Sequence, residues 1–188
     1  MARPSNRERL LDSFEVLLST RGASEATLDA IAADAGVSKG GLTYHFSSKA
    51  ALLEAFGDRL LGRIDEMVAE VPPEPRAVIE WYLTYQSSDP AEEAMWRSLL
   101  AGMHGANEGL RAVVNEAFVR YAAPLSVLDP ELADHVRLLG DGLFLNALLG
   151  QPLPPAPHLE RLVDELAARA DQSGRTPTPT TSPDASSS

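Results

Sequence analysis

The chain has 188 residues, a formal net charge of −11 and no cysteine. This length fits one large domain or two small ones, and the lack of cysteine excludes disulfides, thiol catalysis and zinc–thiolate sites. No apolar stretch reaches the roughly 18–20 residues of a membrane span, and the N-terminal segment lacks the apolar run of a secretory signal. We therefore expect a soluble, cytoplasmic protein with no membrane partner.

The negative charge is unevenly distributed along the chain. Residues 1–50 carry equal numbers of basic and acidic side chains, so the acidic surplus follows residue 50. The two lysines, Lys39 and Lys49, both lie in this first part. Because phosphate binding is driven by Lys and Arg, a neutral first quarter on an acidic remainder indicates two parts with different roles. A general preference for Arg over Lys is the alternative explanation for the two lysines.

Helices alternate with capping signals over the first 70 residues. Apolar residues at helical spacing predict a first helix over residues 5–20. Ser or Thr residues suited to the N-cap position precede the second, third and fourth helices. Glycines follow the first and second helices. The predicted boundaries are Arg21-Gly22 at the end of the first helix, Thr27 to Ala35 before Gly36 for the second, Ser38 to about Tyr44 or His45 for the third, and Ser48 to the segment VPPEP for the fourth.

Beyond VPPEP the pattern stays helical, and no period-2 strand pattern appears. From Asp171 onward the sequence is polar and of low complexity, so it cannot bury enough surface to order itself. The count is about nine helices in an all-α fold. The predicted segments are 75–87, 90–103, 107–123, 130–149 and 157–170.

The second and third helices, joined by a short turn at Gly36, have the spacing of a helix-turn-helix, whose second helix enters the major groove of DNA. Gly40 and Gly41 begin that helix, although glycine in a helix costs about 1 kcal/mol relative to Ala. Absent side chains let the backbone come close to the duplex, and free N–H groups there favour phosphate. A tight loop is the alternative reason for the two glycines.

Residues 27–56 resemble the DNA-binding region of the TetR family of bacterial transcriptional regulators. The matching residues are Thr27, Ile31-Ala32, Gly36-Val37-Ser38, Lys39-Gly40, Leu42, Tyr44-His45-Phe46 and Ser48-Lys49. The resemblance implies an N-terminal three-helix helix-turn-helix domain over residues 1–48, an effector-binding and dimerisation domain over 49–171, and a disordered tail over 172–188.

The same resemblance implies a set of contacts with double-stranded DNA. The recognition helix would meet base edges or nearby phosphates, and its neighbours would hold the sugar-phosphate backbone, which positions the protein without reading sequence. For Tyr44 and His45, packing between helices is the alternative. The predicted DNA-binding residues are Thr27, Ser38, Lys39, Gly40, Gly41, Thr43, Tyr44, His45 and Lys49. Leu42 and Phe46 should instead face a small core with Phe14, Ile31 and Val37.

Two residues depart from the family pattern. Asp29 stands where many members carry a basic residue that can reach a base, and Thr43 stands where an aromatic residue or Leu is more usual. We therefore expect an operator that differs from those of well-known members.

In this family the remaining helices form a ligand pocket and a dimer interface. The segment 130–149 is apolar over more than one stripe, so it must be covered on two sides, by its own domain and a partner subunit or by its own domain alone. The predicted interface residues are Val136, Leu139, Gly140, Leu143, Leu162 and Leu166. The predicted pocket residues, each of which also suits a helical core, are Trp81, Tyr85, Trp96, Met103, His104, Phe118, Tyr121 and Asn146.

Catalysis is not expected. The four histidines are scattered, and the sequence contains no HExxH, GxSxG or phosphate-loop motif. No metal or cofactor is predicted. The resemblance implies a homodimeric repressor that a small-molecule effector releases from a palindromic operator. A helical protein–protein adaptor whose helix-turn-helix no longer binds DNA is the alternative.

The substitution Lys49→Ala tests the role assigned to this lysine. A phosphate contact carries no sequence information, so binding should weaken alike on all duplexes, and the slope of log affinity against log salt should fall by about one. Salt titrations on two unrelated duplexes measure both quantities. A changed sequence preference would contradict the assignment.

Overall fold

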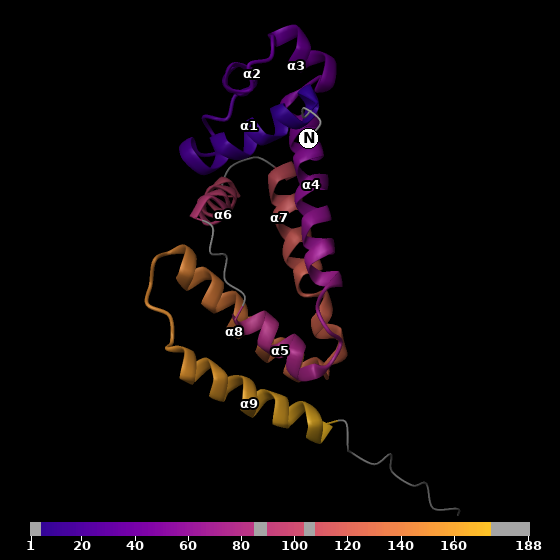
Figure 1. Cartoon of the computed structure of the whole chain (residues 1–188), viewed down its shortest axis with the longest axis vertical. Coiled ribbons are helices and arrows are strands. Elements are labelled where there is room, and N and C mark those ends of the chain that lie inside the picture. The colour runs from indigo at the N-terminus through magenta and orange to yellow at the C-terminus, as the bar shows by residue number, and fades with distance from the viewer. Residues whose placement is uncertain (1–4, 85–89, 104–107, 174–188) are drawn as a thin grey trace, which may run out of the picture.

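The computed structural model describes residues 5–84, 90–103 and 108–173, and within these ranges the chain is helical throughout its regular structure. The elements are α1 (Asn6–Arg21), α2 (Leu28–Asp34), α3 (Lys39–His45), α4 (Lys49–Ala69), α5 (Pro75–Thr84), α6 (Pro90–Gly102), α7 (Glu108–Tyr121), the 3₁₀ helix η1 (Ala123–Val127), α8 (Pro130–Leu148) and α9 (Ala156–Ser173). The all-α fold predicted from the sequence is confirmed. Figure 1 shows an elongated molecule with α1–α3 at one end, α9 at the other and α4 running between them.

The predicted N-caps explain why the first helices begin where they do. The side chains of Thr27, Ser38 and Ser48 each accept a hydrogen bond from the backbone N–H three residues later, at 3.2, 3.1 and 3.1 Å. Gly36 has a φ of 61°, the left-handed conformation that glycine adopts without a steric penalty. Local sequence chemistry therefore defines the turn between α2 and α3.

Two predicted boundaries in the C-terminal half are wrong. The segment 107–123 ends as α7 at Tyr121, and η1 follows with Pro124 in its first turn. A proline ring clashes with the carbonyl four residues earlier in an α-helix, so α7 stops. The polar tail was expected from Asp171, but α9 continues to Ser173. Ala170 packs against the core there and anchors the last turn.

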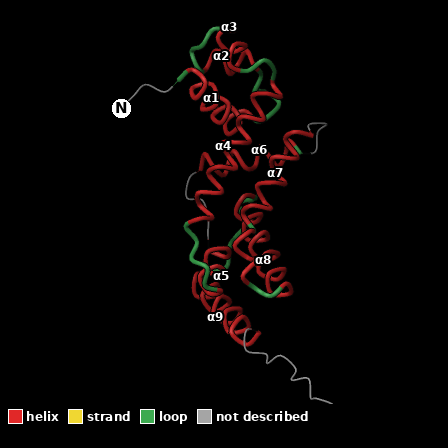
Figure 2. The backbone as a smooth tube through the Cα atoms, turned by 90° about the vertical axis from the view of Figure 1, so that its right-hand side faces the viewer, coloured by secondary structure: helices red, strands yellow, loops and turns green. Residues whose placement is uncertain are grey.

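Buried side chains form two hydrophobic cores. The first joins α1, α2, α3 and α4 to α6 and α7, and the second joins α5, η1, α8 and α9. Figure 2, turned from the first view, shows α4 descending from the end that holds α1–α3 toward α5. Hydrophobic packing therefore continues across residue 48, the expected domain boundary, because α6 and α7 complete the core of the first three helices.

The structure places most of the predicted dimer-interface residues inside the chain. Val136 is fully buried and Leu166 is 6% exposed, both in the second core. A Cβ atom on Gly140 would collide with the ring of Tyr82 and lie 3.0 Å from its carbonyl oxygen. These residues face α5 and α9 of the same chain, which corrects the expectation that they meet a partner. Leu143 and Leu162 are partly buried against the same core, and Leu139 is 41% exposed.

Across the described ranges, none of the helices combines the length and the hydropathy that a bilayer crossing demands.

Two glycines of α8 offer a matched test of this packing. Gly140→Ala should lower the free energy of unfolding by about 1–3 kcal/mol, because its methyl group overpacks the contact with Tyr82. Gly142 has no atom within 4 Å of a built Cβ, so Gly142→Ala should raise stability by up to about 1 kcal/mol through helix propensity. Urea unfolding at one low protein concentration compares the two. Equal effects of the two substitutions on stability would show that position 140 does not need to be glycine.

Candidate nucleic-acid interface and effector cavity

Helix α3 presents a polar face to solvent and an apolar face to the first core. Leu42 and Phe46 are 2% and 3% exposed and lie in one cluster with Phe14 and Ile31, as the sequence predicts. Tyr44, on the opposite face, is 85% exposed. An aromatic side chain so open to water contributes little to the core, so its ring is available to a partner outside the chain, and its DNA contact stays a prediction.

Lys39 is held by a partner from α2. Its Nζ atom lies 2.8 Å from a carboxylate oxygen of Asp29, and both side chains are well exposed. The residue that departs from the family pattern thus neutralises the one lysine of the recognition helix. Thr43, one turn further on, donates its hydroxyl to the carbonyl of Lys39 at 2.9 Å.

The two glycines of α3 have different surroundings. Nothing lies within 4 Å of a Cβ built on Gly40, which is exposed. A Cβ on Gly41 would lie 2.9 Å from Val37 and 3.2 Å from the hydroxyl of Ser38, and the N–H of Gly41 already donates to that hydroxyl. The turn therefore accounts for the glycine at position 41, and the DNA contact of Gly41 stays a prediction. Gly40 remains a candidate for close approach to DNA, because it is exposed and open.

Of the other residues predicted to contact DNA, two cap helices and two are half-buried. Thr27 and Ser38 use their hydroxyls as N-caps. His45 is half-buried, with its ring centroid 5.1 Å from that of Tyr44. Lys49 is half-buried and donates from Nζ to the carbonyl of Ala23 at 3.2 Å. An ammonium has three donors, so Lys49 retains capacity for a phosphate, and its DNA contact stays a prediction.

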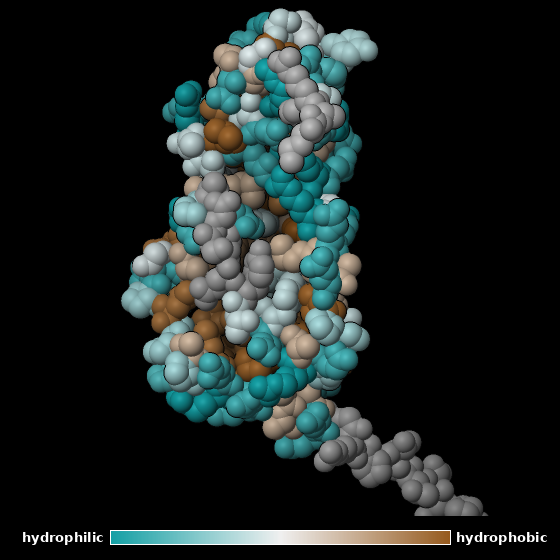
Figure 3. Space-filling view, viewed as in Figure 1, coloured by the Kyte–Doolittle hydropathy of each residue, from teal (hydrophilic) through white to brown (hydrophobic). Residues whose placement is uncertain are grey.

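A cavity of about 530 Å³ lies between the helices of the two cores. Its walls come from α1, α4, α5, α6, α7 and α8, and Figure 3 shows the surface hollowed at this height of the molecule. The volume is in the range of small-molecule sites. Helix α1 contributes directly to the wall, so the cavity is bounded in part by the helix that packs on α2 and α3.

The cavity contains three of the eight pocket residues predicted from the sequence, namely Trp96, Phe118 and Tyr121. Trp81, Met103 and Asn146 do not line it, so a ligand contact of these three stays a prediction. The ring of Trp81 packs on Tyr82 and Tyr121, Met103 packs against the first core, and Asn146 is exposed on α8. Tyr85 and His104 lie outside the described residues.

Aromatic rings from three helices form one side of the cavity. The ring centroids of Trp96, Phe118 and Phe144 are 5.9–6.0 Å apart in each pair, with the planes steeply inclined. Sequence reasoning missed Phe144, although its spacing from Gly140 and Leu148 along α8 places all three on one face. Such edge-to-face packing makes an apolar wall with accessible ring faces and edges.

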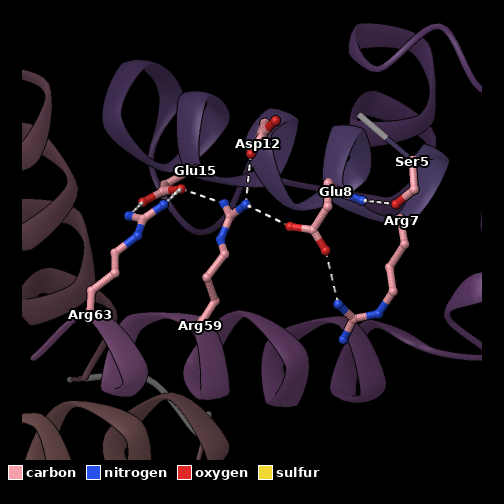
Figure 4. Close-up of polar contacts among 7 residues, drawn as sticks. All are labelled: Ser5, Arg7, Glu8, Asp12, Glu15, Arg59 and Arg63. Atoms are coloured by element: carbon pink, nitrogen blue, oxygen red, sulfur yellow. Dashed lines mark hydrogen bonds and ion pairs between the residues drawn. The ribbon is translucent and has the colours of Figure 1, made fainter. Parts of the chain in front are cut away.

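Ion pairs join α1 to α4 beside the cavity (Figure 4). Arg59 of α4 contacts Glu8, Asp12 and Glu15, which lie on one face of α1. Arg63, one turn later, contacts Glu15 at 2.5 Å. The sequence signal was available, because acids at positions i, i+4 and i+7 share a helix face, but no local pattern pairs them with α4.

A second polar pair lies in the wall formed by α5 and α8. The hydroxyl of Tyr82 donates to Asp141 at 2.9 Å, and Asp141 also lies 3.7 Å from Arg137. Burial, followed by the charge of Asp141, raises the pKa of Tyr82 well above its usual range. Tyr82 is therefore a neutral hydrogen-bond donor at all ordinary pH values.

Comparison with known proteins agrees with this architecture. Residues 10–56 match the model of bacterial regulatory proteins of the tetR family, and residues 76–171 match the tetracyclin repressor-like C-terminal domain. The chain belongs to the TetR family. It is a helix-turn-helix DNA-binding transcriptional regulator with a C-terminal ligand-binding domain.

Several relatives resemble the chain over most of its length. It is 29% identical to the HTH-type transcriptional regulator EthR of Mycolicibacterium smegmatis, over 83% of this chain and 82% of the relative. The crystal structure of the regulator SCO7518 from Streptomyces coelicolor A3(2) superimposes with a TM-score of 0.67 at 25% identity, over 87% of this chain and 99% of that one. The multidrug binding protein EbrR complexed with malachite green shares the fold, with a TM-score of 0.67 at 24% identity over 89% and 98% of the two chains.

The pair between Lys39 and Asp29 predicts the effect of Asp29→Asn. Loss of the carboxylate frees Lys39 and removes a charge that repels phosphate, so affinity for duplex DNA should rise by up to about fivefold, the range of an exposed ion pair. Fluorescence anisotropy in low salt measures it. The control Glu66→Gln also removes one negative charge, but Glu66 lies about 25 Å along α4 from Lys49, the first residue of that helix. It should therefore change the affinity less. Unchanged or weaker binding by a folded Asp29→Asn variant would contradict this role.

Proposed function

We propose that two copies of this chain bind a palindromic operator as a repressor and release it when a small molecule occupies the cavity. In this proposal residues 1–48 present the DNA-binding surface, through Lys39, Gly40, Thr43 and Tyr44 with Lys49 on α4. Residues 49–171 build the dimer and most of the effector site.

The observation that carries the effector role is the composition of the cavity wall. Its lining includes Asp12 and Glu15 of α1 together with residues of α6, α7 and α8. A molecule in this space touches both the helix that supports α2 and α3 and the helices of the C-terminal part. An effector shifts the regulator only if it binds the two states with different affinity, typically by 1–3 kcal/mol. A ligand that contacts both α1 and the helices of the C-terminal part would provide that difference if the two states differ in this wall.

An exposed apolar stripe on α8 supports dimerisation. Leu138, Leu145 and Leu149 are 63%, 49% and 61% exposed, and with Gly142 they follow the spacing i, i+4, i+7 and i+11 along one face. Apolar surface is visible over this part of the molecule in Figure 3. The stripe is a better candidate for the partner face than the buried residues that the sequence first indicated. A symmetric dimer would place two α3 helices on the half-sites of a palindrome.

The relatives support the regulatory role. EthR is an HTH-type transcriptional regulator, and EbrR is a multidrug binding protein crystallised with ethidium as well as with malachite green. The adaptor alternative leaves the exposed Tyr44 and Lys39 of α3 without a purpose.

One substitution tests the proposal. Leu145→Glu places a charge in the α8 stripe, so the variant should sediment as a monomer and bind the DNA upstream of its own coding region at least about tenfold more weakly, because half-sites are then bound singly. Sedimentation velocity and footprinting measure the two effects.

Val119→Glu is the matched control, because Val119 is also exposed, at 66%, but lies on α7. It should leave both properties unchanged. A wild-type protein that is monomeric, or that leaves these duplexes unprotected in low salt, would overturn the proposal.

A further inference from the structure

The charged groups that line the cavity are mainly acidic. Its described lining contains five carboxylates, those of Asp12, Glu15, Glu92, Glu93 and Asp141, and one cationic side chain, that of Arg63. Four of the acids have partners with basic groups outside the lining. Arg59 contacts Asp12 and Glu15, Arg97 contacts Glu93, and Arg137 contacts Asp141.

Arg63 differs from these outer arginines because its guanidinium lies in the cavity wall itself. Its side chain is 50% exposed, whereas that of Arg59 is 16% exposed. The pKa of Arg63 is raised, first by its hydrogen bond to Glu15 and further by the charges of Glu15, Asp12 and Glu92, while burial acts in the opposite direction. Three carboxylates therefore act on one guanidinium that is tethered to a long, flexible side chain.

The rest of the wall complements a flat organic molecule. The rings of Trp96, Phe118 and Phe144 form the apolar side described above, and Tyr121 also lines the space. Aromatic faces attract cations within about 6 Å of the ring centroid. Among the described residues, no group of three His, Asp or Glu side chains converges closely enough to hold a metal ion, so an organic cation suits this site better than an inorganic one.

We propose that the effector is an aromatic organic cation whose charged group replaces the guanidinium of Arg63 beside Glu15 and Glu92. This proposal rests on the function proposed above. The aromatic body of the molecule then lies against Trp96, Phe118 and Phe144. An anionic effector is disfavoured, because the five acids of the lining still outnumber the four arginines, Arg63 in the wall and Arg59, Arg97 and Arg137 outside it, that contact them.

The exchange also explains how occupancy reaches the DNA-binding helices. The Arg63–Glu15 pair ties α4 to α1 on the cavity side, and Arg59 holds the next turn through Glu8 and Asp12 (Figure 4). When a ligand takes the place of Arg63, α4 loses the ion pair of one of the two arginines that contact α1, while the hydrophobic packing between the helices remains. Helix α1 also lies near the end of α3, where the guanidinium of Arg7 is 5.6 Å from the ring centre of Phe46.

A matched pair of dyes tests the charge requirement. Ethidium is a quaternised phenanthridinium, and 3,8-diamino-6-phenylphenanthridine is its uncharged parent. Calorimetric titration of the full-length protein without DNA should show one saturable site per chain for ethidium, with about tenfold weaker binding of the parent, since contacts with partly buried charged groups have that magnitude.

Variants of the chain test the position of the charge. Arg63→Gln should strengthen ethidium binding severalfold, because the competing guanidinium is gone, and Glu15→Gln and Glu92→Gln should each weaken it. Glu8→Gln is the control, because Glu8 also contacts Arg59 but does not line the cavity, so its affinity for ethidium should be unchanged. Glu92→Gln leaves the α1–α4 contacts intact if Glu15→Gln fails to fold.

Equal binding of the two dyes, no saturable site for ethidium, or weaker binding by Arg63→Gln would each overturn the proposal. The assay contains no DNA. Its failure therefore leaves the proposed repressor function open to its own test, and a failure of operator binding leaves the dye result unaffected.

Discussion

Helix α1 packs against α2 and α3 through its apolar face and joins α4 through ion pairs on its acidic face. Leu10, Leu11 and Phe14 are at most 2% exposed in the first core, and the carboxylates of Glu8 and Glu15 point to arginines of α4 (Figure 4). Both the orientation of the recognition helix and the shape of the cavity depend on this one helix. In the function proposed above, a change in the cavity wall would reach the DNA-binding surface through this helix alone.

The two arginines of α4 that contact α1 differ in their exposure to solvent. Arg59 is mostly buried and contacts three acids, so it anchors the junction. Arg63 is half exposed, so water screens its attraction to Glu15 and another cation can compete for that carboxylate. At the edge of the aromatic cavity, α1 and α4 are thus linked by one arginine that is fixed by burial and one that another cation can displace.

On the DNA-binding face, sequence reasoning succeeded where chemistry is local. The caps at Thr27 and Ser38, the left-handed Gly36 and the buried Leu42 all follow from residues within one turn of each other. It did not foresee the close approach of Gly41 to Val37, which depends on how the turn folds back onto α3. It noted Asp29 as unusual, but the pairing with Lys39 joins two helices and has no sequence spacing of its own.

The sequence by itself determined the helices, their capped boundaries in the N-terminal part and the family pattern over residues 27–56, because capping and helical periodicity act between residues three or four apart. The tertiary structure alone decided that α6 and α7 complete the core of the first three helices, that Val136 and Leu166 face inward, and that acids of α1 border the same cavity as Phe144. These contacts join residues dozens of positions apart. An amphipathic helix shows that it has a face to bury, but not which helix will cover it.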